Sequence, residues 1–102
     1  MQPDFLNLSL FQLRNLLTQQ VPFLFLDLTT SEVMDSEVTS LLQRATKVEA
    51  DKAIEFVEAK AADPSFPVVL VANRAEQGAF VAQALASKNF INLYLLALDE
   101  LA

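Results

Sequence analysis

The fold of this chain is decided by one segment, Pro67-Val68-Val69-Leu70-Val71-Ala72-Asn73-Arg74-Ala75-Glu76-Gln77-Gly78-Ala79. Its apolar first part, Val68 to Ala72, is rich in β-branched residues and predicts a strand that is buried on both faces. A short polar loop follows, the only glycine of the chain lies close behind it, and a helix is expected from about Glu76 to Ser87. A strand that leads through a short loop into a helix is the repeating unit of α/β domains, and the loop commonly carries a nucleophile or binds an anion.

The amino-acid composition limits the chemistry that this loop can perform. The 102 residues include no cysteine and no histidine. A thiolate nucleophile, a disulfide and a histidine base are therefore excluded, and the usual nitrogen and sulfur ligands of metals are missing. The acids Asp35, Glu37, Glu49 and Asp51 match no calcium loop and are interpreted as a solvated face. We expect neither a metal ion nor another cofactor.

The charge of the chain restricts its partners. The formal net charge is −6, and the seven basic residues are scattered along the sequence. Nucleic acids and anionic membranes bind proteins through clustered basic residues, so we expect neither as a partner. No apolar run approaches the roughly 18 residues that a membrane span requires, and the first residues do not have the pattern of a secretory signal. We therefore expect a single cytoplasmic domain that covers residues 1–102.

Helical and strand patterns alternate along the rest of the chain. Ser9 and Gln12 have the spacing of a capping box, which predicts a helix that ends before Val21-Pro22. Asp51 is expected to cap a further helix, which ends before Asp63-Pro64. The other strands are expected at Phe23 to Leu28, Ala45 to Val48 and Asn92 to Leu98, with a short additional strand near Phe5 to Leu8.

The stretch from Thr29 to Gln43 is ambiguous, because a capping box over Thr29 to Glu32 and a short helix capped by Ser36 are both compatible with it. In the helix that starts at Glu76, the residues expected to face inward are Phe80, Val81, Ala84 and Leu85. Asn89 suits the left-handed conformation that ends a helix.

Strands separated by helices of this length predict parallel βαβ units with right-handed connections. Helices are expected on both faces of the sheet, since its central strands are apolar on both faces. The predicted fold class is α/β: a small three-layer αβα domain with a mostly parallel sheet of four or five strands.

The order of these segments resembles the rhodanese-like domain family. Phe25-Leu26-Asp27-Leu28 is similar to the family's hydrophobic-Asp-hydrophobic-Arg strand, and Pro67 to Ala72 resembles the strand that leads into its active-site loop. Leu41-Leu42-Gln43-Arg44-Ala45-Thr46-Lys47-Val48 stands where the family has His-Ile-Pro-Gly-Ala. The closing Gly-Phe-x-Asn-Val-x-x-Leu pattern is similar to Lys88-Asn89-Phe90-Ile91-Asn92-Leu93-Tyr94-Leu95-Leu96. The resemblance covers almost the whole chain and implies the rhodanese-like fold.

The polar positions of the family's active-site loop differ in this chain. The resemblance implies a loop of the form Cys-Arg-Ser-Gly-x-Arg-Ser, whose cysteine carries the transferred sulfur, and Asn73 stands at that position. Arg74 agrees with the pattern, whereas the glycine, second arginine and last serine are replaced by Glu76, Gly78 and Ala79. An asparagine amide cannot become a nucleophile or hold a persulfide, so sulfur transfer and cysteine-dependent phosphatase activity are excluded. The chain is similar to a degenerate member of the family that lacks the active-site cysteine.

Further signature positions outside the loop also differ. Thr29 replaces the arginine that follows Asp27 in the family pattern. The histidine and glycine of His-Ile-Pro-Gly-Ala are replaced by Leu41 and Arg44, and Leu98-Asp99 replaces a Gly-Gly pair. We take Asp27, Thr29 and Arg44 as possible neighbours of the loop. Asp27 is expected to act structurally, as a cap or in an ion pair with Arg44 or with the arginine of the loop.

The resemblance and the missing cysteine predict a catalytically inactive rhodanese-like domain, not an enzyme, with a role in binding, regulation or self-association. Its partner is another protein or a second copy of the chain. The candidate site is the degenerate active-site loop, which consists of Asn73, Arg74, Ala75, Glu76, Gln77, Gly78 and Ala79. In the simplest interpretation the loop is a connector, in which Glu76 complements the helix dipole and Gly78 permits close packing.

Two alternatives stay open. In the first, the chain is a small-molecule-binding or anion-binding protein, or an enzyme that needs no thiol, and reuses the loop Asn73 to Ala79. In the second, it belongs to another small α/β family, such as an anti-sigma-antagonist-like or phosphotransfer-like domain. Strand order distinguishes the second alternative, because a rhodanese-like domain has its loop strand in the centre of a parallel sheet.

The end of the chain, Tyr94 to Ala102, is unusually apolar. One interpretation is a buried last strand followed by a shortened final helix. The other is an exposed patch that recruits a partner or a second copy, which predicts a homodimer formed through this tail.

Overall fold

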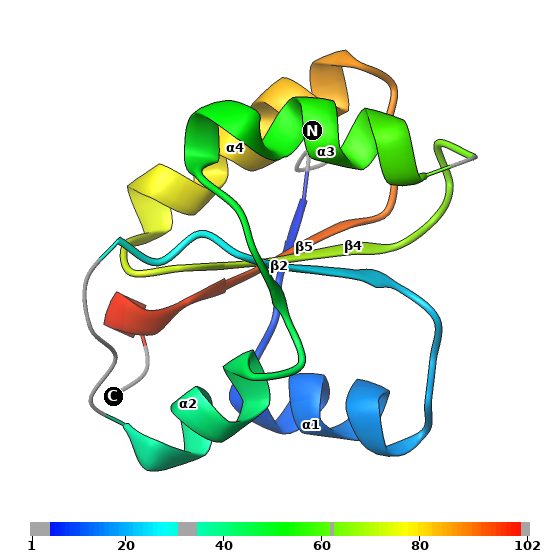
Figure 1. Ribbon diagram of the computed structural model, residues 1–102. Coiled ribbons are helices and arrows are strands. Elements are labelled where there is room, and N and C mark those ends of the chain that lie inside the picture. The colour runs from blue at the N-terminus through cyan, green and yellow to red at the C-terminus, as the bar shows by residue number, and fades with distance from the viewer. Residues whose placement is uncertain (1–4, 31–34, 62, 101–102) are drawn as a thin grey trace.

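The computed structural model describes residues 5–30, 35–61 and 63–100. Within these ranges five parallel strands form one sheet in the order β1-β5-β4-β2-β3 (Figure 1). The strands are β1 (Leu6–Asn7), β2 (Leu24–Asp27), β3 (Thr46–Lys47), β4 (Val68–Ala72) and β5 (Leu93–Ala97). The strand that leads into the candidate loop, β4, therefore lies in the centre, as the family resemblance requires.

Helices cover both faces of the sheet (Figure 1). The first face carries α1 (Leu10–Thr18) and α2 (Ser36–Leu42), and the second carries α3 (Ala53–Lys60) and α4 (Ala75–Ser87). Two short 3-10 turns, η1 (Ala50–Lys52) and η2 (Leu98–Glu100), complete the described elements. The predicted three-layer αβα architecture is confirmed. No helix of the described residues is long and apolar enough to cross a membrane.

The central strand β4 explains why the sheet has a core on each side. All five of its residues are fully buried. Val69 and Val71 face the smaller core beneath α1 and α2, whereas Val68, Leu70 and Ala72 face the larger core beneath α3 and α4. A strand with apolar side chains at consecutive positions can be accommodated only between two covering layers.

The expected boundaries of α1 and α4 follow from local hydrogen bonds. The capping box is confirmed: Ser9 Oγ accepts from the Gln12 amide at 3.1 Å, and the Ser9 amide donates to Gln12 Oε1 at 2.8 Å. Asn89 has a φ of 75°, the left-handed conformation predicted beyond the end of α4. Left-handed geometry also occurs at Gln20, with a φ of 57°, where the chain turns towards β2.

Three of our predictions about the helices are wrong. Ser36 is the first residue of α2, and the cap is Asp35, whose Oδ1 accepts from the amides of the second and third helical residues. Asp51 lies inside η1, so it does not cap α3. Phe80 does not face inward, since 73% of it is exposed on the outer side of α4. The capping box proposed over Thr29 to Glu32 extends outside the described residues.

Candidate functional site

The candidate loop lies where β4 passes into α4, at the carboxyl edge of the sheet. Asn73 and Arg74 form the connection, and α4 begins at Ala75. Arg74 takes the cap position in an extended conformation, but its side chain makes no capping hydrogen bond. The first turn of α4 therefore needs hydrogen-bond acceptors from elsewhere, because its leading amides have no partners within the helix.

The acceptor for the first of these amides comes from a residue that is distant in sequence, near the end of the described chain. Asp99, in η2, accepts a hydrogen bond from the Ala75 amide at 3.0 Å through its carboxylate Oδ1. In return, the Asp99 amide donates to the carbonyl of Asn73 at 3.0 Å. A carboxylate at a helix N-terminus is stabilised by the helix dipole, and this one satisfies the Ala75 amide, which could otherwise bind an anion. The chain thus supplies its own anion at this helix start.

The side chain of Asn73 is also engaged. Its Oδ1 accepts from the Thr30 amide at 2.7 Å and lies 3.3 Å from the Thr30 hydroxyl. Gln77, the third residue of α4, donates from Nε2 to the carbonyl of Leu28 at 3.3 Å. These contacts tie the loop after β4 to the segment that follows β2.

Asp27 and Thr29 form a second polar cluster with a residue that the sequence did not single out, Lys47. Asp27 Oδ1 accepts from the Thr29 amide at 2.9 Å and from its hydroxyl at 2.6 Å. Lys47 donates to the carbonyl of Thr29 and, at 2.9 Å, to its hydroxyl, and its Nζ lies 3.8 Å from Asp27 Oδ1. The ion-pair partner of Asp27 is therefore Lys47, and not an arginine as predicted. Arg44 precedes β3 and so lies towards the opposite, amino edge of the sheet.

Gly78 has a packing role. It is buried in α4, and a Cβ atom built there would lie 2.9 Å from Leu95 Cδ2 and closer still to Cδ1. The glycine thus allows α4 to approach β5, as the connector interpretation predicts. Arg74 and Glu76 are both exposed, and Glu76 stands in the first turn of α4, where the helix dipole favours a negative charge.

No family model and no curated protein matches this sequence. Among solved structures, a rhodanese-like domain from Anabaena sp. superposes with a TM-score of 0.66 at 17% identity, over 95% of this chain and 69% of that one. A polysulfide-sulfur transferase from Wolinella succinogenes, solved as a homodimer, superposes with a TM-score of 0.63 at 18% identity, over 94% of this chain and 72% of that one. The chain has a rhodanese-like fold.

In this rhodanese-like fold the loop after β4 makes hydrogen bonds to two other parts of the chain. Asn73 holds Thr30, and Asp99 holds the start of α4. A cavity of about 410 Å³ lies beside it at the carboxyl ends of β2 and β3, but none of its lining residues comes from the loop itself. Among the residues that the structure describes, no group of three acidic, histidine or cysteine side chains could hold a metal ion.

Three residues that carry this arrangement were missed by the sequence reasoning: Thr30, Lys47 and Asp99. Lys47 could have been found from strand pairing alone, because it lies in register with Asp27 once β3 is placed beside β2. The contact between Asp99 and Ala75 joins residues 24 positions apart. No local pattern announces it, although Leu98-Asp99 replaces a pair of glycines in the family resemblance.

Proposed function

We propose that this chain is a catalytically inactive rhodanese-like domain that acts by binding another protein or a second copy of itself. The proposal rests on one observation: the carboxylate of Asp99 accepts from the Ala75 amide at the start of α4. In a rhodanese loop that position serves a sulfur or oxygen anion. Here a covalently tethered carboxylate competes for it, and the chain has no cysteine to bring a thiolate.

Reuse of the loop for an external anion receives less support. Asp99 and Glu76 place two negative charges around the first turn of α4, and the net charge of the whole chain is −6. Arg74 is the only basic residue between 73 and 79. An incoming anion would have to displace the Asp99 carboxylate and overcome this repulsion.

Self-association is the more specific form of the proposal. The Wolinella transferase with the same fold is a homodimer, which supports a second copy as partner. Within the described part of the apolar tail, Leu95, Leu96 and Ala97 are buried in β5, which agrees with the interpretation as a buried last strand and leaves these three residues no place in an exposed patch. Light scattering over a range of protein concentrations would test this form, and a strictly monomeric mass at high concentration would leave only a different protein as the partner.

Loss of catalysis is tested with the protein itself and with a cysteine returned to the loop. The wild-type chain should form no thiocyanate from thiosulfate and cyanide. The Asn73→Cys variant carries a single thiol, since the natural sequence contains none. We expect iodoacetamide to alkylate this thiol only slowly, because the Asp99 carboxylate already neutralises the helix start that would lower its pKa.

Removal of the Asp99 charge shows how far this carboxylate lowers the rate of alkylation. The double variant Asn73→Cys/Asp99→Asn should be alkylated roughly twofold to fivefold faster than Asn73→Cys alone. Asn73→Cys/Glu100→Gln is the matched control, since it removes one charge from the same turn at a residue that does not cap α4 in the described contacts. Thiocyanate formation by the wild type, or equal rates for the two double variants, would contradict the proposal.

A further inference from the structure

A cavity of about 350 Å³ lies on the opposite edge of the domain from the candidate loop, between α1 and the amino half of the sheet. It is lined by Leu8, Gln12, Asn15, Leu16, Val21, Phe23, Pro67, Val69 and Tyr94. None of these residues belongs to the loop 73–79 or contacts it through a described hydrogen bond. Binding in this cavity therefore does not depend on whether the domain transfers sulfur.

The cavity is a gap at the end of the smaller core. Leu8 and Val69 are buried members of that core, and Leu16, Phe23 and Tyr94 pack against it. The helix that covers this region, α1, ends at Thr18, after which the chain turns back towards β2. The walls of the cavity are thus mostly apolar, and its volume falls in the range of small-molecule sites, about 300–1,000 Å³.

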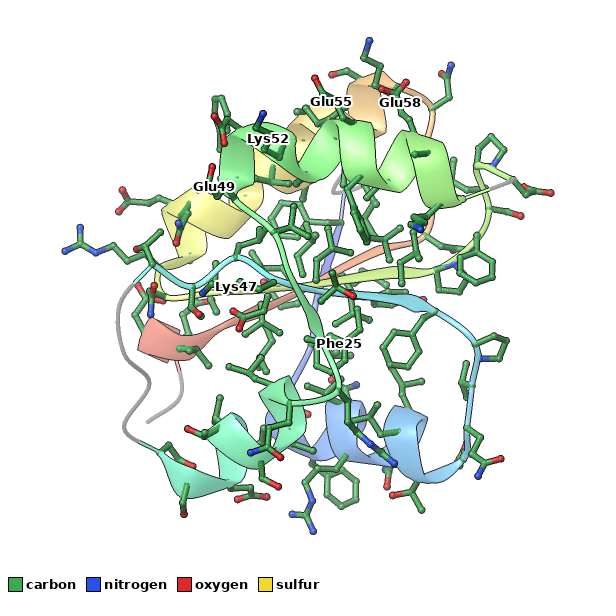
Figure 2. All side chains as sticks on the ribbon, viewed as in Figure 1. Phe25, Lys47, Glu49, Lys52, Glu55 and Glu58 are labelled. Atoms are coloured by element: carbon green, nitrogen blue, oxygen red, sulfur yellow. The ribbon has the colours of Figure 1, made fainter. Side chains whose placement is uncertain are left out.

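Two aromatic rings shape the wall. Phe23 packs against Phe25 with ring centroids 5.7 Å apart, and Figure 2 shows Phe25 in the layer between the sheet and the helices α1 and α2. Tyr94 contributes the second ring, from the second residue of β5. Aromatic walls of this kind stabilise a flat, ring-shaped molecule more than a flexible chain, because offset ring contacts add to the burial of apolar area.

The polar groups at the rim determine which molecule fits. Gln12 and Asn15 are exposed, and no lining side chain carries a formal charge. Gln12 Oε1 accepts from the Ser9 amide and has one further lone pair, whereas both hydrogens of its NH₂ group make no described hydrogen bond, so Gln12 is chiefly a donor towards a ligand. A charged ligand would lose hydration without meeting an opposite charge, which is costly.

We propose that this cavity binds a small neutral molecule with an apolar ring and a hydrogen-bond acceptor such as a carbonyl oxygen. The ring lies between Phe23 and Tyr94 over Val69, and the acceptor faces the amides of Gln12 and Asn15 at the rim. The ligand class is set by three properties of the wall: apolar residues, aromatic rings and the absence of charged side chains among the lining residues.

The proposal is tested with two probes of the same shape and different charge, 2-naphthamide and 2-naphthoate. Each is titrated into the ¹⁵N-labelled full chain, and the dissociation constants are taken from amide chemical shifts. We expect 2-naphthamide to shift the signals of the lining residues, led by Gln12, Asn15 and Val69. It should bind about tenfold more tightly than 2-naphthoate, since the carboxylate loses hydration at the rim without meeting an opposite charge.

A positive charge introduced at the rim tests whether the polar group of the ligand faces Asn15. Asn15→Lys should raise the affinity for 2-naphthoate roughly twofold to fivefold, because the ammonium group can pair with the carboxylate at the cavity mouth. The matched control is Gln83→Lys, an exposed position on α4 across the sheet, which adds the same charge far from the cavity. Equal gains for the two variants would overturn the assignment.

Three further outcomes would also overturn it. These are equal affinity of the wild type for both probes, shifts centred on residues 73–79, and shifts of the lining residues on raising the protein concentration without a probe. The last result would mean that a second copy of the chain occupies the cavity.

Discussion

The carboxylate of Asp99 accepts a hydrogen bond from the amide of Ala75, so the last described turn of the chain caps the helix that follows the central strand. Asp99 also donates from its own amide to the carbonyl of Asn73, two residues before Ala75. These two hydrogen bonds join η2 to the connection between β4 and α4. Their consequences can be measured separately from any activity.

Asp99→Ala should lower the free energy of unfolding by about 1 kcal/mol, the usual cost of losing a helix cap. Urea denaturation followed by circular dichroism measures the change. Glu100→Ala is the matched control, because it removes an equal charge from the same 3-10 turn. Equal losses for the two variants would mean that only the overall charge matters and that the cap contributes nothing.

Gly78→Ala should destabilise the domain by about 1 kcal/mol, even though alanine is the better helix former. The added methyl group overlaps the side chain of Leu95, which is only 1% exposed and therefore has little room to move. In a Leu95→Ala background the overlap is gone, so the same substitution should become neutral or stabilising. Urea denaturation of the four proteins of this cycle measures the coupling, and additive effects would refute the packing role.

The sheet could be predicted from the sequence because burial on two faces leaves a strong local pattern. Consecutive apolar residues placed β4 at Val68 to Ala72, and β2 and β5 to within a residue or two at each end. It was harder to predict which face of each helix is buried. Phe80 suits an inward position by residue type, but Gly78, Val81, Ala82 and Leu85 define a buried stripe on the opposite side of α4.

The polar contacts of the site could not be predicted, because they depend on tertiary neighbours. Asp99 meets Ala75, and Asn73 meets Thr30 across 43 positions of sequence, only after β2, β4 and β5 have paired. The family resemblance in the sequence suggests which residue stands where a rhodanese-like domain has its nucleophile. It does not reveal that the carboxylate of a distant residue has taken over the helix start.

The pKa of Asp63 is lowered by hydrogen bonds from the hydroxyl and the amide of Ser65, at 2.7 and 2.8 Å. The lowered value means that these contacts stabilise the fold above the ordinary carboxyl pKa and lose this effect as the pH falls through the folded value. Ser65→Ala removes the hydroxyl and should raise the pKa of Asp63 towards its usual range. An NMR titration of the carboxyl carbon measures it. Ser87→Ala, a distant serine change, should leave the value as it is, and an unchanged pKa in Ser65→Ala would contradict the assignment.

Asp27 fixes the position of Thr29 through two hydrogen bonds, so removal of the Asp27 carboxylate should destabilise both the end of β2 and the candidate loop. Thr29 is only 4% exposed, and both its amide and its hydroxyl donate to Asp27 Oδ1. Asp27→Ala leaves these groups without that acceptor, which should cost about 1–3 kcal/mol. Asp27→Asn retains an acceptor oxygen and should cost less. Its remaining cost reflects the loss of the negative charge beside Lys47.

The same two variants test whether this cluster supports the candidate site. Thr30 follows Thr29 directly and donates to Asn73, so its amide should exchange with solvent faster in Asp27→Ala than in Asp27→Asn. Asp51→Ala, an exposed acid in η1, is the control for the loss of one negative charge. If Asp27→Ala destabilised the chain no more than Asp51→Ala and left the exchange at Thr30 unchanged, the hydrogen bonds of Asp27 would have no part in positioning the loop.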